Sequence, residues 1–149
     1  WDTATVKANI LATIAACHNR QMPVVLIQHL ADSELAPFFK PGTSGAAIDP
    51  DIRQAAPEAP VVIKHYADAF HHTELDDTLR RLGVKKILLS GMMTQNCVTF
   101  TALSKAAEKY EPAVLSDCCT TVSEMLHRIA LNALSIRVPL VTMAVLRNP

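Results

Sequence analysis

Short apolar runs alternate with segments of helical period along this chain. The runs are apolar on both sides, as expected for strands that helices cover on both faces of a parallel sheet. They occupy residues 24–27, 61–63, 87–89, 113–115 and 140–146. Between them, apolar residues recur every three or four positions, which predicts helices over residues 3–20, 73–83, 97–110 and 123–134. The alternation predicts an α/β fold: a three-layer α/β/α architecture with a doubly wound, mainly parallel, Rossmann-like sheet.

Residues 30–60 interrupt this alternation. The segment is rich in Pro, Gly, Ser and Ala, and it offers a single helical turn at about residues 49–53. Loops of this length in compact domains are usually functional covers or disordered segments. We interpret the segment as a wall or lid of a binding site.

Polar residues follow the predicted strands at their carboxyl ends. Gln28 and His29 end the first strand and Lys64 ends the second, while residues 91–97 follow the third and Asp117 follows the fourth. In open parallel sheets, ligands bind beyond the carboxyl ends of the strands. These segments are therefore expected to meet at one edge of the sheet and to form a site there.

Cys97 is the candidate nucleophile among them. It lies in or near the first turn of a predicted helix, where unpaired backbone N–H groups and the helix dipole favour negative charge. A thiol so placed ionises more easily, and the same N–H groups can hold the oxyanion of an acyl-transfer reaction. The alternative from position alone is an inert core cysteine, because free Cys often behaves as a small hydrophobe.

Composition narrows the class of protein. A chain of 149 residues fits one domain, here residues 1–149, and its 14 basic and 14 acidic residues give a net charge of zero. Neither nucleic acid nor an anionic membrane is expected as a partner. The four cysteines include a vicinal pair, Cys118 and Cys119, and do not form a disulfide framework. With no apolar run of membrane-spanning length and no leader, we expect a cytoplasmic protein.

The residues around the second and third predicted strands resemble a known family. The resemblance rests on Ile63 and Lys64, on Thr101 and Ala102, and above all on the stretch Gly91-Met92-Met93-Thr94-Gln95-Asn96-Cys97-Val98. These residues are similar to the isochorismatase-like cysteine hydrolase superfamily, which includes nicotinamidases, N-carbamoylsarcosine amidases and isochorismatases. The resemblance covers the whole chain and is strongest from about residue 61 to residue 128. It implies a six-stranded parallel sheet flanked by helices.

The resemblance also implies the chemistry of the site. It makes Cys97 the nucleophile and Lys64 the partner that helps to deprotonate the thiol and stabilises its charge. It implies a cis peptide bond between Met92 and Met93, which directs the N–H of Met93, together with that of Cys97, at the oxyanion.

Three further residues are candidates for substrate binding. His29 and Thr94 lie in the polar segments at the strand ends, and Phe70 follows the second strand. The alternative for Phe70 is an ordinary core position. His29 is likewise open to a substrate-binding role or to a structural one. The substrate itself is not fixed by these residues, because its choice depends on the loop at residues 30–60.

The chain departs from the family pattern in one respect. The family triad is Asp, Lys and Cys, and its Asp ends a first strand that is central in the sheet. Neither Asp2, at a helix start, nor Asp68, in the loop after Lys64, matches that position. Loss of a central strand would leave two ladders of unpaired backbone groups, each costing about 1 to 3 kcal/mol where buried. We therefore expect that strand to be missing from the sequence shown and not from the functional protein.

No metal or other cofactor is expected. Nicotinamidases carry an Asp-x-His segment and a further His for a divalent ion, whereas His29 stands here without that spacing. The group of His65, His71 and His72 lacks a matching partner, and real metal sites need ligand count and geometry together.

The residues and the resemblance together favour a metal-independent cysteine hydrolase that cleaves a C–N bond of a small amide-type substrate through a thioester. An isochorismatase-type vinyl-ether hydrolase is the second enzyme hypothesis. A catalytically inactive relative that binds or oligomerises is the non-enzymatic one. A homo-oligomer is expected in each case.

Overall fold

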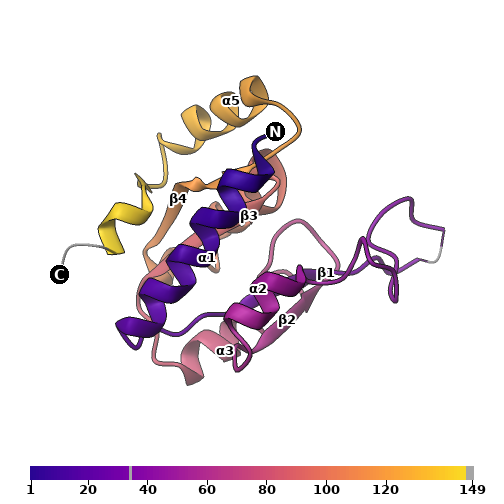
Figure 1. Ribbon diagram of the computed structural model, residues 1–149, viewed down its shortest axis with the longest axis horizontal. Coiled ribbons are helices and arrows are strands. Elements are labelled where there is room, and N and C mark those ends of the chain that lie inside the picture. The colour runs from indigo at the N-terminus through magenta and orange to yellow at the C-terminus, as the bar shows by residue number, and fades with distance from the viewer. Residues whose placement is uncertain (34, 147–149) are drawn as a thin grey trace.

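The computed structural model describes residues 1–33 and 35–146 (Figure 1). The strands in this part of the chain are β1 (Leu26–His29), β2 (Val61–Lys64), β3 (Ile87–Met92), β4 (Pro112–Thr120) and β5 (Leu140–Val141). The α-helices are α1 (Thr3–Asn19), α2 (Pro50–Ala55), α3 (Leu75–Arg81), α4 (Thr99–Ala102) and α5 (Glu124–Leu134). A π-helical turn, η1 (Thr94–Val98), and two 3₁₀ turns, η2 (Glu108–Tyr110) and η3 (Met143–Leu146), complete the described elements.

All strand pairs are parallel in the described residues. β1 pairs with β2, and the register places His29 beside Lys64. β4 lies between β3 and β5 in a second sheet. The first strand is shifted by two residues from the predicted 24–27, so that Gln28 and His29 form its last two positions. The predicted parallel α/β fold is confirmed.

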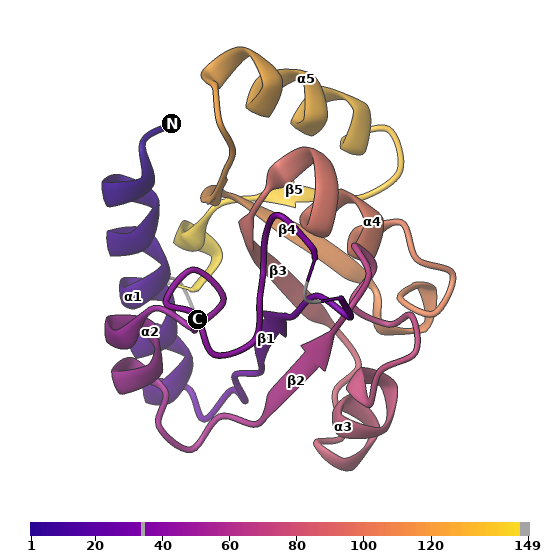
Figure 2. The ribbon, with the colours of Figure 1, turned by 90° about the vertical axis from the view of Figure 1, so that its right-hand side faces the viewer.

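The helices form two outer layers around the strands. α1 and α2 lie on one side, and α3, α4 and α5 lie on the other (Figure 2). Adjacent residues of β3 face these two layers in turn, because side chains alternate along a strand. Leu88 packs with Ile10 of α1 and with Met143, whereas Leu89 packs against the clusters on the side of α3 and α5. β3 is thus covered on both faces, as its apolar run predicted, whereas Ile27 of β1 and Val61 and Ile63 of β2 are exposed.

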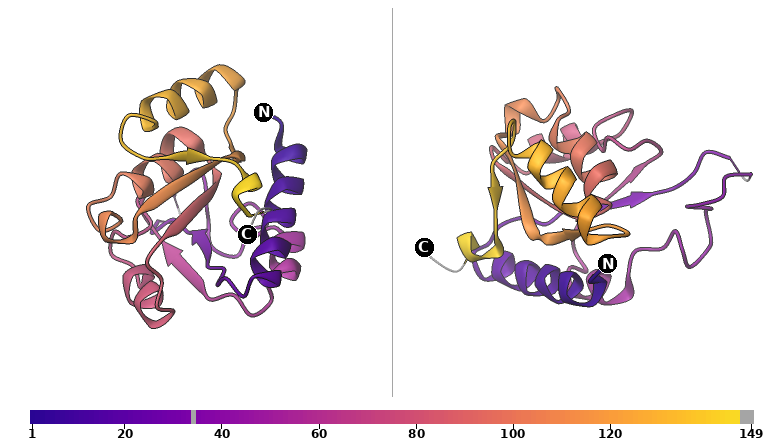
Figure 3. Two further views of the ribbon diagram at one scale, coloured as in Figure 1. Left: turned by 90° about the vertical axis from the view of Figure 1, so that its left-hand side faces the viewer. Right: turned by 90° about the horizontal axis from the view of Figure 1, so that it is seen from above.

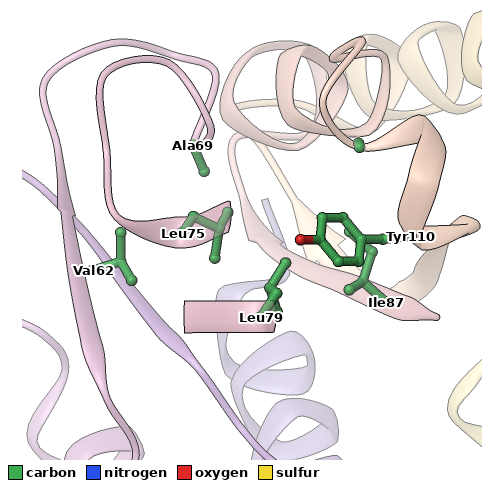
Figure 4. Close-up of a cluster of buried hydrophobic side chains, with 7 residues drawn as sticks. Val62, Ala69, Leu75, Leu79, Ile87 and Tyr110 are labelled. Atoms are coloured by element: carbon green, nitrogen blue, oxygen red, sulfur yellow. The ribbon is translucent and has the colours of Figure 1, made fainter. Parts of the chain in front are cut away.

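One core cluster joins β2, β3 and α3 (Figure 4). Its buried members are Val62, Ala69, Leu75, Leu79, Ile87, Ala107 and Tyr110. The ring of Tyr110 stacks on Phe70 with 5.9 Å between centroids, and its hydroxyl donates to the carboxylate of Asp76 over 2.6 Å. Burial, followed by the hydrogen bond to Asp76, raises the pKa of Tyr110 to about 12. The phenol of Tyr110 in this cluster therefore stays protonated.

The helix predicted over residues 97–110 is interrupted, and that prediction is wrong. α4 ends at Ala102, and the chain continues in tighter turns in which Ala107 N bonds to Ser104 O at 2.9 Å and Tyr110 N to Ala107 O at 2.8 Å. The apolar period persists through this segment because Ala107 and Tyr110 are buried in the cluster with α3. Periodicity alone does not distinguish that packing from a continuous helix.

The strand predicted over residues 140–146 is also wrong in its second half. Only Leu140–Val141 pairs with β4, and the chain then turns into η3. The carboxylate of Asp117 accepts a hydrogen bond from the N–H of Met143 over 3.0 and 3.1 Å. Because this N–H bonds to a side chain, it is not available to a strand ladder.

The segment between β1 and α2 extends away from the strands before it returns (Figures 1 and 3). The helical turn predicted near residues 49–53 is present as α2, whose first turn is capped by Asp49. Lys7 of α1 forms ion pairs with Asp49 at 2.8 Å and with Asp51 at 2.6 Å. These contacts hold the returning end of the segment against α1.

A gap separates the two sheets. Within the described residues, β1 is paired only with β2, and β3 only with β4, so one edge of each strand has no partner strand. Cavities of about 310 Å³ on the side of α3 and about 360 Å³ on the side of α1 and α2 flank this gap. Val25, Ile27 and Leu89 line both cavities. The gap lies where the resemblance places the central first strand.

The described helices include none that is long and apolar enough to span a bilayer.

Truncation of the core side of α5 should destabilise the fold. Leu134 is 1% exposed, whereas Ile129 on the same helix is 60% exposed. Leu134→Ala should lower the free energy of unfolding by about 2 to 5 kcal/mol, because it removes buried contacts and leaves a cavity. Ile129→Ala should change it by no more than about 0.5 kcal/mol. Urea unfolding followed by circular dichroism measures both, and equal effects would contradict this packing.

Candidate active site

A tight connection between β3 and η1 places Cys97. Gly91 has a φ of +122°, a conformation that residues with a Cβ rarely adopt, although nothing lies within 4 Å of an added Cβ there. The conformation of the backbone, not crowding, therefore requires glycine at this position of β3. The Met92–Met93 peptide bond that follows is cis. The chain then enters η1, and Cys97 is the fourth residue of that turn.

The turn that carries Cys97 is wider than an α-helix. Val98 N bonds to Met93 O at 3.4 Å, which is the i to i−5 spacing of a π-helix, and Thr99 Oγ1 donates to Thr94 O at 2.6 Å. Short π-helical segments inside helices are frequent at functional sites. Cys97 is partly exposed here and does not occupy a buried core position.

The cavity of about 360 Å³ brings the predicted residues together. His29, Lys64, Gly91, Met92 and Cys97 line it, and they come from β1, β2, β3 and η1. The other cavity lies near α3 and includes neither Cys97 nor Lys64. The expected meeting of strand ends therefore occurs at the carboxyl edge of the sheets.

Lys64 is a buried cation. Its side chain belongs to a residue that is 3% exposed, and its Nζ donates to the carbonyl oxygens of Tyr66 at 3.0 Å and Ala67 at 2.7 Å. A buried charge is costly unless it is paired and hydrogen-bonded. Across residues 1–33 and 35–146, no carboxylate forms an ion pair with this ammonium. Within the described residues, the side chain of Lys64 is therefore compensated by backbone carbonyls and not by a carboxylate.

His29 lies next to the thiol. Its Nδ1 is 3.9 Å from Cys97 Sγ, and its ring stacks on Phe39 with 4.3 Å between centroids and 9° between planes. Burial, followed by the positive charge of Lys64, lowers the pKa of His29. The imidazole next to the thiol is thus held in its uncharged form over a wider range of pH.

Two of the three predicted substrate-binding residues do not line this cavity. Phe70 packs with the core cluster and stacks on Tyr110. Thr94 is fully buried, and its hydroxyl forms a 2.9 Å hydrogen bond with Nδ1 of His127. Only His29 lines the cavity. The structure gives Phe70 and Thr94 packing and hydrogen-bonding roles instead.

Gln28 and Asp117 also serve the fold, and Asp117 lies inside β4 and not after it as predicted. The side chain of Gln28 donates to the carbonyl of Ala46 at 2.8 Å, and so ties the long loop to β1. Asp117 holds the N–H of Met143 and does not line the cavity. The convergence predicted from the strand ends therefore holds for His29, Lys64 and the segment 91–97, but not for these two.

The residue that sequence analysis missed is Phe39. It comes from the segment interpreted as a wall of the site, lines the cavity and supports the ring of His29. Ala31 N bonds to Phe39 O at 2.8 Å, which folds this part of the loop back beside β1. The signal available was an aromatic pair, Phe38 and Phe39, in a segment otherwise rich in small residues.

The other histidines near the strand ends have protein partners. His65 pairs with Asp32 at 2.7 Å, and its ring contacts the carbonyl of Leu30 at 2.8 Å. His71 and His72 pack against each other and against Tyr66. No cluster of three or more His, Cys, Asp or Glu side chains suited to a metal ion occurs among the described residues.

Comparison with known proteins identifies the family. The family model for the isochorismatase domain matches residues 1–145. The chain belongs to the isochorismatase family. Gly91, Cys97 and Lys64 line one cavity of this isochorismatase-family fold, next to the cis peptide bond.

Relatives and solved structures in this family match most of the chain. YddQ of Bacillus subtilis, described as an uncharacterized isochorismatase family protein, is 31% identical over 115 residues, 77% of this chain and 63% of YddQ. Nicotinamidase 3 of Arabidopsis thaliana is 27% identical over 134 residues, 83% of this chain and 68% of that protein. The crystal structure of an isochorismatase hydrolase from Oleispira antarctica has a TM-score of 0.86 and 30% identity, covering 98% of this chain and 83% of that one. The chain spans less than two thirds of the length of YddQ.

The buried pair of Thr94 and His127 predicts a pH dependence of stability. Burial lowers the pKa of His127, so the unfolded chain binds a proton on this residue more readily than the folded one. The free energy of unfolding should therefore fall as the pH is lowered from about 7.5 to about 5.5, through the usual histidine range. His127→Gln should flatten this dependence, measured by urea unfolding at each pH. The exposed His18→Gln serves as the control and should keep the wild-type slope.

Proposed function

We propose that the protein is a metal-independent cysteine hydrolase that cleaves a C–N bond of a small amide-type substrate. One observation carries this proposal: a partly exposed thiol on a helical turn and a buried ammonium group line the same cavity. A positive charge in a site of low dielectric stabilises a thiolate far more than it would in water.

The proposed reaction is an acyl transfer to sulfur. The thiolate of Cys97 attacks the substrate carbonyl, and the N–H groups of Met93 and Cys97 hold the resulting oxyanion. The amine leaves, a thioester forms on Cys97, and water then releases the acid. Lys64 remains charged throughout and stabilises the anionic sulfur, because its two carbonyl partners fix its Nζ at the edge of the cavity.

A carboxylate is proposed to complete the site from the gap between the sheets. An extended segment between β1 and β3 would pair with both free edges, and its alternating side chains would enter the cavities on either face. Its carboxyl end would lie near the ends of β1 and β3, where Lys64 has no carboxylate partner among the described residues. The family's Asp belongs at such an end, which is why we assign the missing acid to this position.

Amide hydrolysis is favoured over the second reaction by the chemistry of the site and by a relative. The Arabidopsis relative is named a nicotinamidase, which implies an amide substrate for that protein. Vinyl-ether hydrolysis is the second candidate, and the matching family model carries its name. Product analysis separates them, because amide cleavage releases ammonia or an amine and isochorismatase-type cleavage releases pyruvate.

A reducing compartment such as the cytoplasm is proposed as the location. Cys17, Cys97, Cys118 and Cys119 are all free thiols. A nucleophilic thiolate stays active only where it is not oxidised. The homo-oligomer remains a prediction.

Removal of the nucleophile should abolish turnover without loss of the fold. In the full-length protein, Cys97→Ser should reduce hydrolysis of every amide in a panel of small amides to background, because serine is not ionised at neutral pH. The residue is partly exposed, so the melting temperature should stay near that of the wild type. Cys17→Ala, at a thiol on α1 that is 8% exposed, is the matched control and should keep turnover. Turnover retained in Cys97→Ser would contradict the mechanism.

Replacement of Lys64 tests the role of the ammonium. Lys64→Met keeps the length of the side chain and removes the charge, so kcat/KM should fall by about 10² to 10³, the usual cost of removing one group that stabilises a developing charge. Lys7→Met removes a lysine from the surface ion pairs with α2 and should leave kcat/KM unchanged. Steady-state kinetics on the best amide of the panel gives both values. Similar losses of kcat/KM in Lys64→Met and Lys7→Met would indicate a general effect of charge and contradict the role of Lys64.

A further inference from the structure

Thr101 is a buried hydroxyl on the helical segment that carries the thiol. It lies in α4, four residues after Cys97, and residues four apart share one face of a helix. Both residues line the cavity of about 360 Å³. Thr101 is 6% exposed, so its hydroxyl needs partners within the protein.

Those partners belong to the loop that holds the ammonium of Lys64. The N–H of Ala69 donates to Thr101 Oγ1 at 2.9 Å, and Thr101 Oγ1 donates to the carbonyl of Ala67 at 3.5 Å. The same carbonyl of Ala67 accepts a hydrogen bond from Lys64 Nζ at 2.7 Å. One hydroxyl therefore ties the helix of the nucleophile to the backbone that fixes the cation.

The loop has few other polar ties to the rest of the fold. Among the described residues, Thr101 is the only side chain from beyond residues 64–73 that hydrogen-bonds to residues 66–70. Ala69 is 3% exposed and belongs to the core cluster of Figure 4, so water does not replace the hydroxyl at its N–H. The position of the Ala67 carbonyl depends on this contact.

We propose that Thr101 is a positioning residue that fixes the ammonium of Lys64 relative to the thiol of Cys97. It acts through the backbone of Ala67 and Ala69 and does not touch the reacting atoms. A small displacement of a reacting group reduces the rate strongly, and this is the displacement that Thr101 prevents. The inference rests on the proposed function and leaves the roles of Lys64 and of the family's acid unchanged.

Alkylation of Cys97 by iodoacetamide tests this role without a known substrate. The thiolate is the reactive form, so the rate at about pH 6.5 relative to that at about pH 9 reports how readily the thiol ionises. In full-length Thr101→Val, which keeps the shape and removes the hydroxyl, this ratio should fall by about tenfold because a displaced ammonium stabilises the thiolate less. Thr101→Ser keeps the hydroxyl and should keep the wild-type ratio. Mass spectrometry of the Cys97 peptide gives each rate.

A double variant separates positioning of Lys64 from general loosening of the turn. Lys64→Met alone should also lower the ratio of alkylation rates, because it removes the ammonium. Adding Thr101→Val to Lys64→Met should then change the ratio by less than about twofold, since Thr101 acts through Lys64. A hydroxyl that only supports the helix would lower the ratio in both backgrounds.

Stability by itself does not test the proposal, because loss of the hydroxyl leaves the buried N–H of Ala69 unpaired in any case. Rates are therefore measured below the melting temperature of each variant. Thr101→Ala also lacks the hydroxyl and should match Thr101→Val. Thr13→Val is the matched control: Thr13 is 8% exposed, its hydroxyl lies 3.4 Å from Cys118 Sγ, and the variant should keep the wild-type ratio.

Three results would each overturn the proposal and leave the proposed function intact. They are a wild-type ratio in Thr101→Val and Thr101→Ala, an equal fall in Thr101→Ser, and a full additional fall in the Lys64→Met background. Turnover retained in Cys97→Ser would overturn the proposed function whatever the alkylation ratios of the Thr101 variants.

Discussion

The buried ammonium of Lys64 is the interaction on which the site depends. Two backbone carbonyls hold its Nζ, and almost none of the residue reaches solvent. An unscreened charge in such a place acts strongly on every neighbour. After burial, it is the next cause that lowers the pKa of the imidazole at His29, and it lines the same cavity as Cys97. One cation thus lies close to both the imidazole and the thiol that line the cavity.

The ends of the strands determine where Lys64 lies. β1 and β2 end together at His29 and Lys64, and β3 ends at the turn that leads to Cys97. Parallel strands bring these ends to one side, so residues far apart in the chain share a cavity. The gap between β1 and β3 opens onto the same region. A segment that entered the gap would both satisfy the free edges and reach the cation, which links completion of the fold to completion of the site.

The long segment after β1 contributes more than a cover. Phe39 supports the imidazole of His29, and the return of the chain is tied to α1 through Asp49 and Asp51. These contacts fix parts of the segment to β1 and to α1. The choice of substrate in this chain is therefore expected to reside in a segment whose ends are fixed by the scaffold.

The sequence by itself determined the alternation of strands and helices, because periodicity acts over a few residues. It also led to the proposed roles of Cys97 and Lys64. Tertiary structure alone decided where the helix after Cys97 breaks and which of His29, Phe70 and Thr94 faces the cavity. Those outcomes depend on contacts between distant segments, such as His29 with Phe39 and Thr94 with His127, and no local pattern encodes them.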